Sequence, residues 1–153
     1  MELLSLAGIY VGTFLFCAVS GLVPFINTEV FLLYVGATAS HAQLPALVLL
    51  AALGQMSAKS LLYYGGRGVF RLPRGRGQAR IEALRKRLSG GRWAAGGVTF
   101  VSALTGLPPF YAISVIAGTL AWPFSRFVLY GTVGRLLRFS AVLFLPGLLK
   151  GVL

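Results

Sequence analysis

Apolar residues dominate the chain in long runs that contain no charged side chain. These runs cover residues 3–28, 30–58 and 93–125. Each run exceeds the roughly 20 apolar residues that an α-helix needs to cross the hydrocarbon core of a bilayer. The pattern predicts an all-α integral membrane protein in which residues 1–153 form a single membrane domain.

The first run predicts a spanning helix followed by a shorter, broken element. The helix is expected over residues 3–23, because Pro24 lacks a backbone donor and disfavours a helical conformation at the preceding residue. Residues 25–39 stay apolar but are interrupted by the polar residues 27–29, and they are too few to span. They predict a re-entrant hairpin, whose broken backbone must be buried by neighbouring helices.

Two further spanning helices are predicted. One covers residues 46–64 and is expected to end at Gly65-Gly66. The other covers residues 124–149 and begins directly after Pro123. Spanning helices and shorter broken segments therefore alternate along the chain.

The apolar stretch 93–122 predicts a second re-entrant hairpin. It contains Gly106 and the pair Pro108-Pro109. Two consecutive prolines exclude a continuous helix. The tip of the hairpin is expected near these prolines.

A short internal repeat supports the two hairpins. Residues 20–25 (SGLVPF) match residues 105–110 (TGLPPF) in register. Counting membrane crossings from the basic segment places the two hairpins on opposite faces. Inverted repeats of this kind, here residues 1–64 and 93–153, are typical of transporters that alternate access around a midplane site. A chance match in apolar sequence is the alternative interpretation.

Composition excludes a water-soluble globule. Of the 153 residues, 57% are hydrophobic and 11% are charged, whereas an ordinary soluble domain is about 25% charged. A net charge of +11 would indicate nucleic acid in a soluble protein. Here the membrane interpretation takes precedence, and nucleic acid is not an expected partner.

The basic residues are concentrated between two apolar runs. Nine of the 14 Lys and Arg residues lie within residues 67–92. Because basic segments remain on the cytoplasmic side of a membrane, residues 65–92 are predicted to form a cytoplasmic loop. Within this loop, residues 80–88 predict a short amphipathic helix whose basic face contacts anionic lipid headgroups.

Several ionisable side chains are predicted to lie at membrane depth, where each costs roughly 2.5–3.5 kcal/mol on insertion scales. Glu29 is too short to reach the surface and must be protonated, paired or beside water, or bound to free backbone N–H groups. Arg135 lies nine residues beyond Arg126, roughly 13 Å deeper along a helix, and Arg138 shares its face. A purely structural tie to hairpin carbonyls is the alternative for this pair. Lys59 is expected to snorkel to the interface, where Arg126 is an anchor.

Together these groups predict a substrate-binding cavity beneath the hairpins. The candidate binding residues are Glu29, Lys59, Arg126, Arg135 and Arg138, and the candidate hairpin-breaking residues are Pro24, Gly106, Pro108 and Pro109. Guanidinium groups bind phosphate oxygens bidentately, and helix ends offer further N–H donors. A phosphate-bearing lipid headgroup is therefore the expected ligand.

Several blocks of the sequence resemble one family of membrane proteins. They are residues 21–29 (GLVPFINTE), 52–56 (ALGQM), 63–67 (YYGGR), 107–109 (LPP) with 117–118 (AG), and 123–139 (PFSRFVLYGTVGRLLRF). Their order and spacing cover most of the chain. They resemble the DedA superfamily of proteins with a VTT domain, and in particular its small YqaA-like branch.

The resemblance implies a multi-pass protein of the bacterial cytoplasmic (inner) membrane with two opposed re-entrant hairpins. It also implies movement of polyprenyl phosphate or a phospholipid across the bilayer, with proton coupling. On this chain the resemblance assigns the hairpin carboxylate to Glu29. It assigns the cations of the last helix to Arg126, Arg135 and Arg138.

Two departures from the family pattern bear on activity. Larger members carry an arginine pair in the second hairpin, whereas residues 102–110 here contain no charge. Lys59 stands where larger members often have an acidic residue. Both differences indicate either a different substrate or no active transport.

The leading hypothesis is a lipid transporter or scramblase, not an enzyme. The alternative is a non-catalytic envelope-maintenance or assembly factor that docks through the basic loop. A hydrolase using Ser20 and His41 is disfavoured, because a catalytic base must reach its nucleophile and His41 lies in a surface turn. One His, one Cys and three acids cannot supply a ligand set, so no metal or other cofactor is expected. Gly8 and Gly12 form a small-xxx-small pair suited to packing against a second copy.

Overall fold

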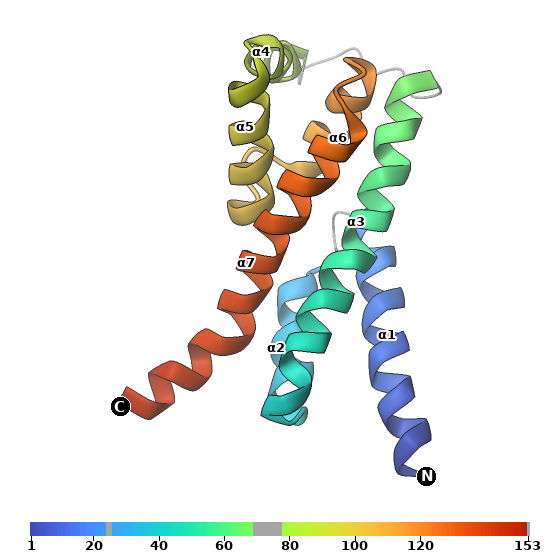
Figure 1. The fold of residues 1–153 in the computed structure, drawn as a ribbon, viewed down its shortest axis with the longest axis vertical. Helices are drawn as coiled ribbons and strands as arrows, with labels where there is room; N and C mark the ends of the chain where they lie inside the picture. Colours follow the sequence, from blue (N-terminus) through green and yellow to red (C-terminus); the bar gives the residue numbers. More distant parts are fainter. Residues whose placement is uncertain (24–25, 69–77, 153) are drawn as a thin grey trace. The chain divides into compact units, whose positions relative to one another are not determined.

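The computed structural model describes residues 1–23, 26–68 and 78–152, and every regular element in them is a helix. The all-α prediction is therefore confirmed for the described residues. The elements are α1 (Glu2–Leu22), α2 (Thr28–Thr38), the 3-10 helix η1 (His41–Gln43), α3 (Leu44–Gly68), α4 (Gln78–Ser89), α5 (Arg92–Thr105), α6 (Phe110–Thr119) and α7 (Phe124–Val152) (Figure 1).

The chain forms two compact units. The first unit comprises Met1–Ala58 and Arg135–Leu153, and the second comprises Lys59–Gly134. Both α3 and α7 contribute to each unit. The division into two repeats over residues 1–64 and 93–153 stays a prediction.

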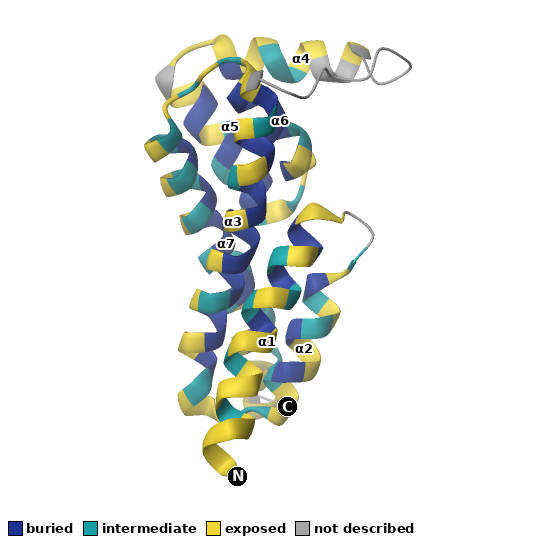
Figure 2. Ribbon diagram, turned by 90° about the vertical axis from the view of Figure 1, so that its right-hand side faces the viewer, coloured by how far each residue is buried: buried dark blue, intermediate teal, exposed yellow. Residues whose placement is uncertain are grey.

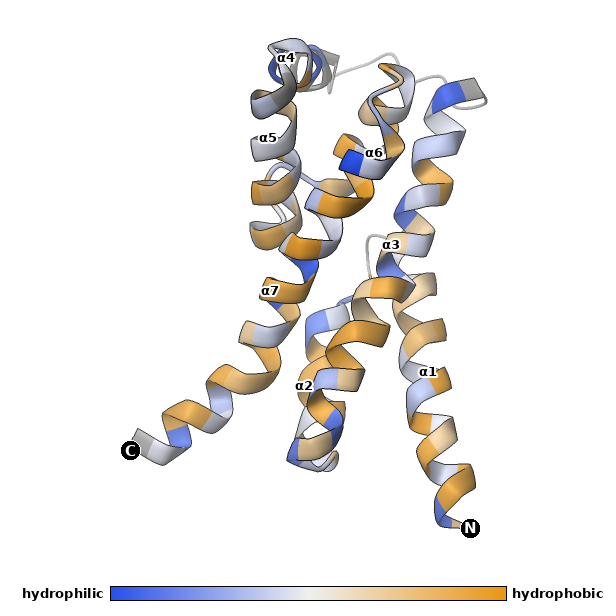
Figure 3. Ribbon diagram, viewed as in Figure 1, coloured by the Kyte–Doolittle hydropathy of each residue, from blue (hydrophilic) through white to orange (hydrophobic). Residues whose placement is uncertain are grey.

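Three stretches of helix are long and apolar enough to cross a membrane, namely Glu2–Leu22, His41–Arg67 and Phe124–Gly151. Apolar colouring recurs along α1, α7 and the N-terminal part of α3, whereas the far end of α3 is mostly pale or blue (Figure 3). Large apolar side chains such as Leu3, Leu61 and Leu148 are more than half exposed. This exposure would be unfavourable in water but suits contact with lipid. The structure therefore supports a membrane protein.

The polar residues 27–29 form the start of a helix. The side chain of Asn27 caps α2, and its Oδ1 accepts hydrogen bonds from the backbone N–H groups of Glu29 (3.0 Å) and Val30 (3.3 Å). An Asn at this position satisfies donors that the helix itself cannot satisfy. From Thr28 to Thr38 the segment is one uninterrupted helix. Pro24, the predicted breaking residue, lies outside the described residues.

The prediction that Gly65-Gly66 ends a helix is wrong, because α3 continues to Gly68. In the second unit, a Cβ on Gly66 would collide with the backbone carbonyl of Val115 in α6. A Cβ on Gly118 of α6 would likewise collide with the carbonyl of Tyr63. These glycines let two helix backbones approach closely, which outweighs their low helix propensity.

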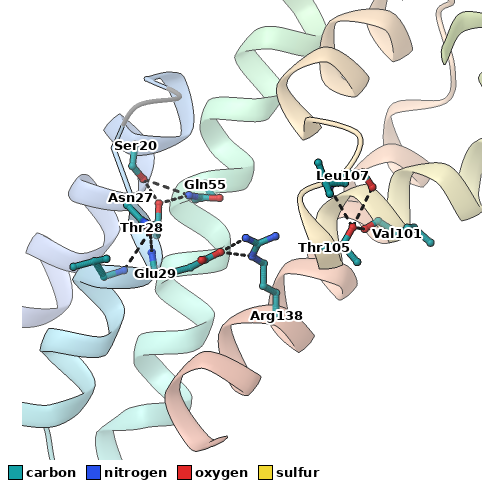
Figure 4. Close-up of polar contacts among 10 residues, drawn as sticks. Ser20, Asn27, Thr28, Glu29, Gln55, Val101, Thr105, Leu107 and Arg138 are labelled. Atoms are coloured by element: carbon teal, nitrogen blue, oxygen red, sulfur yellow. Dashed lines mark hydrogen bonds and ion pairs between the residues drawn. The ribbon is translucent and has the colours of Figure 1, made fainter. Parts of the chain in front are cut away.

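The predicted interruption near residues 106–109 is present in the second unit. Helix α5 ends at Thr105, and Gly106 adopts a left-handed conformation (φ 80°) that favours glycine. The Thr105 hydroxyl oxygen accepts a hydrogen bond from the N–H of Leu107 (3.2 Å; Figure 4). Helix α6 then begins after Pro109. The two short helices are therefore joined by a tight turn, and they contact each other.

Each unit has its own core. In the first unit, side chains from α1, α2, α3 and α7 pack together around Cys17, Leu32, Leu47, Ala51 and Phe139, all fully buried. Each of these helices has both buried and exposed positions along its length (Figure 2). In the second unit, the rings of Phe110 and Tyr63 each stack on that of Phe127. Aromatic stacking of this kind adds specific geometry to apolar burial.

Candidate functional site

Glu29 and Arg138 form an ion pair in the first unit. The Nε of Arg138 donates a hydrogen bond to Oε1 of Glu29 (2.6 Å), and its Nη2 donates to the same oxygen (Figure 4). The Glu29 side chain is 37% exposed and the Arg138 side chain 22% exposed. Two of the predicted site residues, 109 positions apart in the sequence, are thus in direct contact.

The position of Glu29 is set by the start of α2. Glu29 lies in the first turn of that helix, two residues after the capping residue Asn27. A carboxylate there is stabilised by the positive end of the helix dipole. The carboxylate is therefore stabilised by the helix dipole in addition to its bond with Arg138.

A chain of buried hydrogen bonds holds the adjacent residue Thr28. The Ser20 hydroxyl donates to the carbonyl of Cys17 (2.9 Å), so the Thr28 hydroxyl donates to Ser20 Oγ (2.8 Å). The Gln55 amide in turn donates to Thr28 Oγ1 (2.6 Å) and lies 3.3 Å from Ser20 Oγ. This hydroxyl cluster, Ser20, Thr28 and Gln55, ties α1, α2 and α3 together beside the ion pair (Figure 4).

Sequence reasoning missed the hydroxyl cluster. The sequence suggests for Ser20 only a place in the short repeat or a disfavoured role as nucleophile, and for Thr28 an interruption of an apolar segment. Its signal in the sequence is Gln55, a polar residue in the middle of an apolar helix. A buried amide in such a helix requires a hydrogen-bond partner.

Arg135 is buried on α7, one helical turn before Arg138. Its side chain is 8% exposed, and its guanidinium carbon lies 5.9 Å from the centre of the Phe139 ring. Residues three apart share one helix face. With Glu29 ionised, the three groups Glu29, Arg135 and Arg138 carry a formal net charge of −1 + 2 = +1, which favours an anion.

The other two predicted binding residues belong to the second unit. Lys59 is 7% exposed, and its ammonium lies 5.7 Å from the centre of the Tyr111 ring, a cation–π distance. Lys59 thus packs beside an aromatic ring of α6, and its reach to a membrane interface stays a prediction. Arg126 is half-buried in the first turn of α7.

A cavity of about 260 Å³ lies in the first unit between the end of α2 and the end of α7. His41 and Lys150 line it together with apolar residues such as Leu143 and Pro146. Proline at position 146 has no N–H, so it cannot make the regular helical bond to the carbonyl of Val142. The cavity therefore combines two basic side chains with an otherwise largely apolar lining.

No family model, no curated protein and no solved structure matches this chain.

Proposed function

We propose that the protein is a membrane lipid transporter or scramblase that moves a phosphate-bearing lipid, either polyprenyl phosphate or a phospholipid, across the bilayer. The observation that carries the proposal is the Glu29–Arg138 ion pair, with Arg135 buried one turn away on the same helix. Ionisable groups kept among apolar spanning helices are costly, and they are typically retained for function.

The chemistry of the site favours phosphate as the ligand. Arginine presents a planar fork of donors that matches phosphate oxygens. Arg138 already binds a carboxylate oxygen through two of its nitrogens. A phosphate headgroup would compete with Glu29 for the same guanidinium. Protonation of Glu29 would weaken the ion pair, which is how proton coupling would enter.

The proposal includes the finer architecture implied by the resemblance to the DedA superfamily. Helices α2, α5 and α6 have 11, 14 and 10 residues, which is fewer than the roughly 20 needed to span a bilayer. Short apolar helices of this kind support two re-entrant hairpins in an inverted repeat. A bacterial cytoplasmic membrane location, with residues 65–92 in the cytoplasm, is part of the same proposal and follows from the positive-inside rule.

Transport can be tested with the purified protein in vesicles. Labelled polyprenyl phosphate and labelled phospholipid are supplied in separate preparations, and movement between leaflets is followed by chemical quenching of the label. We expect the wild-type protein to accelerate the movement of at least one of the two lipids between leaflets. Glu29→Gln and Arg138→Gln should abolish this acceleration. Glu82→Gln and Arg87→Gln, which change exposed residues of α4, are the matched controls. Wild-type rates equal to those of empty vesicles for both lipids would rule out the proposal.

A second candidate function is a non-catalytic envelope-maintenance or assembly factor that docks through the basic loop. The observation that favours it is the exposure of Lys86 and Arg87 on α4. In this case, charge reversal at Arg85, Lys86 and Arg87 should abolish growth rescue in a deletion strain. Glu29→Gln and Arg138→Gln should then rescue as well as wild type. The opposite pattern supports transport.

A further inference from the structure

The cavity at the end of α2 contains two basic side chains that take no part in the candidate site. Its lining comes from the end of α2, from η1 and the start of α3, and from the second half of α7. His41 and Lys150 are its basic residues. The other described residues that line it are apolar or glycine, and none of them is acidic. The cavity therefore offers an ammonium group and an imidazole beside apolar surface.

The fold of the first unit brings these two basic residues together. The sequence of this unit contains four basic residues, namely His41, Arg135, Arg138 and Lys150. The two arginines lie near Glu29 in the candidate site, whereas the other two line one cavity from different elements. A bound anion would be attracted by the lysine ammonium and could accept an imidazole N–H. Among the described lining residues, nothing else balances the ammonium charge.

Both basic residues stand at the ends of candidate membrane spans. The span over His41–Arg67 begins at His41, and the span over Phe124–Gly151 ends one residue after Lys150. Both side chains are exposed. The ends of a span lie at the level of the lipid headgroups, outside the hydrocarbon core. In a membrane crossed by these spans, the two side chains are therefore at the depth of the lipid phosphates.

The lining favours an anionic lipid over a free phosphate ion. A free ion would lose hydration beside apolar residues such as Leu143 and Pro146 and would gain nothing from them. A phospholipid could place its phosphate on the basic side chains and its upper methylene groups on the apolar ones. Cavities that enclose a drug-sized ligand hold roughly 300–1,000 Å³. The volume of about 260 Å³ is thus enough for the head region of one lipid, whose chains continue into the bilayer.

We propose that this cavity binds one anionic phospholipid in the leaflet opposite the basic loop. Lys150 supplies the positive charge that attracts the phosphate, and the imidazole of His41 donates a hydrogen bond to it. One span separates His41 from Arg67, where the basic segment begins, so the cavity belongs to the other membrane face. The inference rests on the membrane location and does not depend on the proposed transport activity.

The test uses the full chain in phosphatidylcholine nanodiscs that contain a rising fraction of phosphatidylglycerol. An environment-sensitive fluorophore is attached to Ala42→Cys in a Cys17→Ser background, beside His41 but outside the cavity lining. We expect a saturable change in fluorescence that inorganic phosphate does not reproduce. Lys150→Gln and His41→Leu should each raise the half-saturating fraction of phosphatidylglycerol at least threefold. Lys86→Gln, which removes the same charge from an exposed position of α4, should leave it unchanged.

A second pair of variants distinguishes binding in the cavity from attraction to surface charge. Gly147→Leu places bulk in the cavity and keeps both basic residues, whereas Gly151→Leu places the same bulk on α7 outside the lining. A Cβ on either glycine meets nothing within 4 Å, so both variants should fold. We expect Gly147→Leu to weaken phosphatidylglycerol binding at least threefold and Gly151→Leu to leave it unchanged.

Four results would overturn the proposal. The first is a wild-type protein whose fluorescence does not respond to phosphatidylglycerol. The second is equal binding in the wild type, Lys150→Gln and His41→Leu, or equal weakening by Lys150→Gln and Lys86→Gln. The third is unchanged binding in Gly147→Leu, which would assign the effect to surface charge. The fourth is saturation by inorganic phosphate alone, which would assign the cavity to a free anion.

Discussion

Arg138 binds Glu29 through two nitrogens that share a single carboxylate oxygen. This contact joins the first turn of α2 to the middle of α7. It neutralises one of the two arginines on that face of α7. Glu29, Arg135 and Arg138 together therefore keep a positive formal charge. The pair therefore ties two helices together, and under the proposed function it is also the contact that an incoming phosphate would have to separate.

The coupling between the two residues can be measured by exchanging their charges. Glu29→Arg and Arg138→Glu should each lower thermal stability in detergent, because each places two like charges at the contact. The double variant should recover most of the loss, since the attraction is restored in reverse. The pair Glu82 and Arg85 on α4 is the control. These side chains lie 3.8 Å apart and are more than one-third exposed, so exchanging them should show almost no coupling.

Removing the centre of the hydroxyl cluster should destabilise the first unit. Thr28→Val keeps the shape of the side chain but leaves the Gln55 amide and Ser20 without their shared partner. We expect a loss of about 1–3 kcal/mol, the usual cost of an unsatisfied buried group. Ser57→Ala removes an exposed hydroxyl that bonds only its own helix, and it should change stability by less than about 0.5 kcal/mol. The free energy of unfolding in detergent measures the effect of both substitutions. Equal losses of stability in Thr28→Val and Ser57→Ala would contradict the role assigned to Thr28.

Close packing of α3 on α6 predicts that substituting either of two glycines lowers the stability of the protein strongly. Gly66→Ala and Gly118→Ala would each place a methyl group against a backbone carbonyl of the other helix. Because a backbone carbonyl cannot move aside as a side chain can, we expect each substitution to lower the free energy of unfolding by about 1–3 kcal/mol or more. Gly97→Ala in α5 meets nothing within 4 Å and should raise stability by about 0.5–1 kcal/mol. Stabilisation by all three substitutions would show that α3 and α6 are not in close contact.

The orientation of the second span can be tested by labelling single cysteines. In a Cys17→Ser background, Ala42→Cys lies in η1 before α3, and Ala83→Cys lies on α4 after it; both positions are exposed. On the proposed topology, one membrane crossing separates them and the basic loop is cytoplasmic, so an impermeant thiol reagent added to intact cells should label position 42 only. Disrupting the cells should make position 83 reactive. Labelling of both positions from outside would exclude a crossing between them, and the reverse pattern would place the basic loop outside.

Much of the secondary structure can be derived from the sequence alone, because it depends on local chemistry. The run of apolar residues before Pro24 predicts a helix over 3–23, and α1 covers Glu2–Leu22. The pair Pro108-Pro109 predicts an interruption, which the structure contains between α5 and α6. Hydrophobic length and the backbone limits of proline act within a few residues, so they are visible in the sequence.

Local rules fail where a residue serves a distant contact. Gly66 has the chemistry of a helix terminator, yet it lies inside α3 because Val115 packs against it. The polar residues at 27–29 resemble a break, yet Asn27 starts a helix and Thr28 meets Gln55. In both cases the partner is either far away in the sequence or unknown until the helix has formed.

In the candidate site, too, some features follow from the sequence and others only from the folded structure. Its residue types follow from the sequence, because a carboxylate or guanidinium within an apolar run stands out by its cost. That Glu29 meets Arg138, while Lys59 packs beside Tyr111, is evident only in the folded chain. Hydropathy and residue type are properties of single positions. A contact between residues 109 positions apart depends on how whole helices pack, and only tertiary structure contains that information.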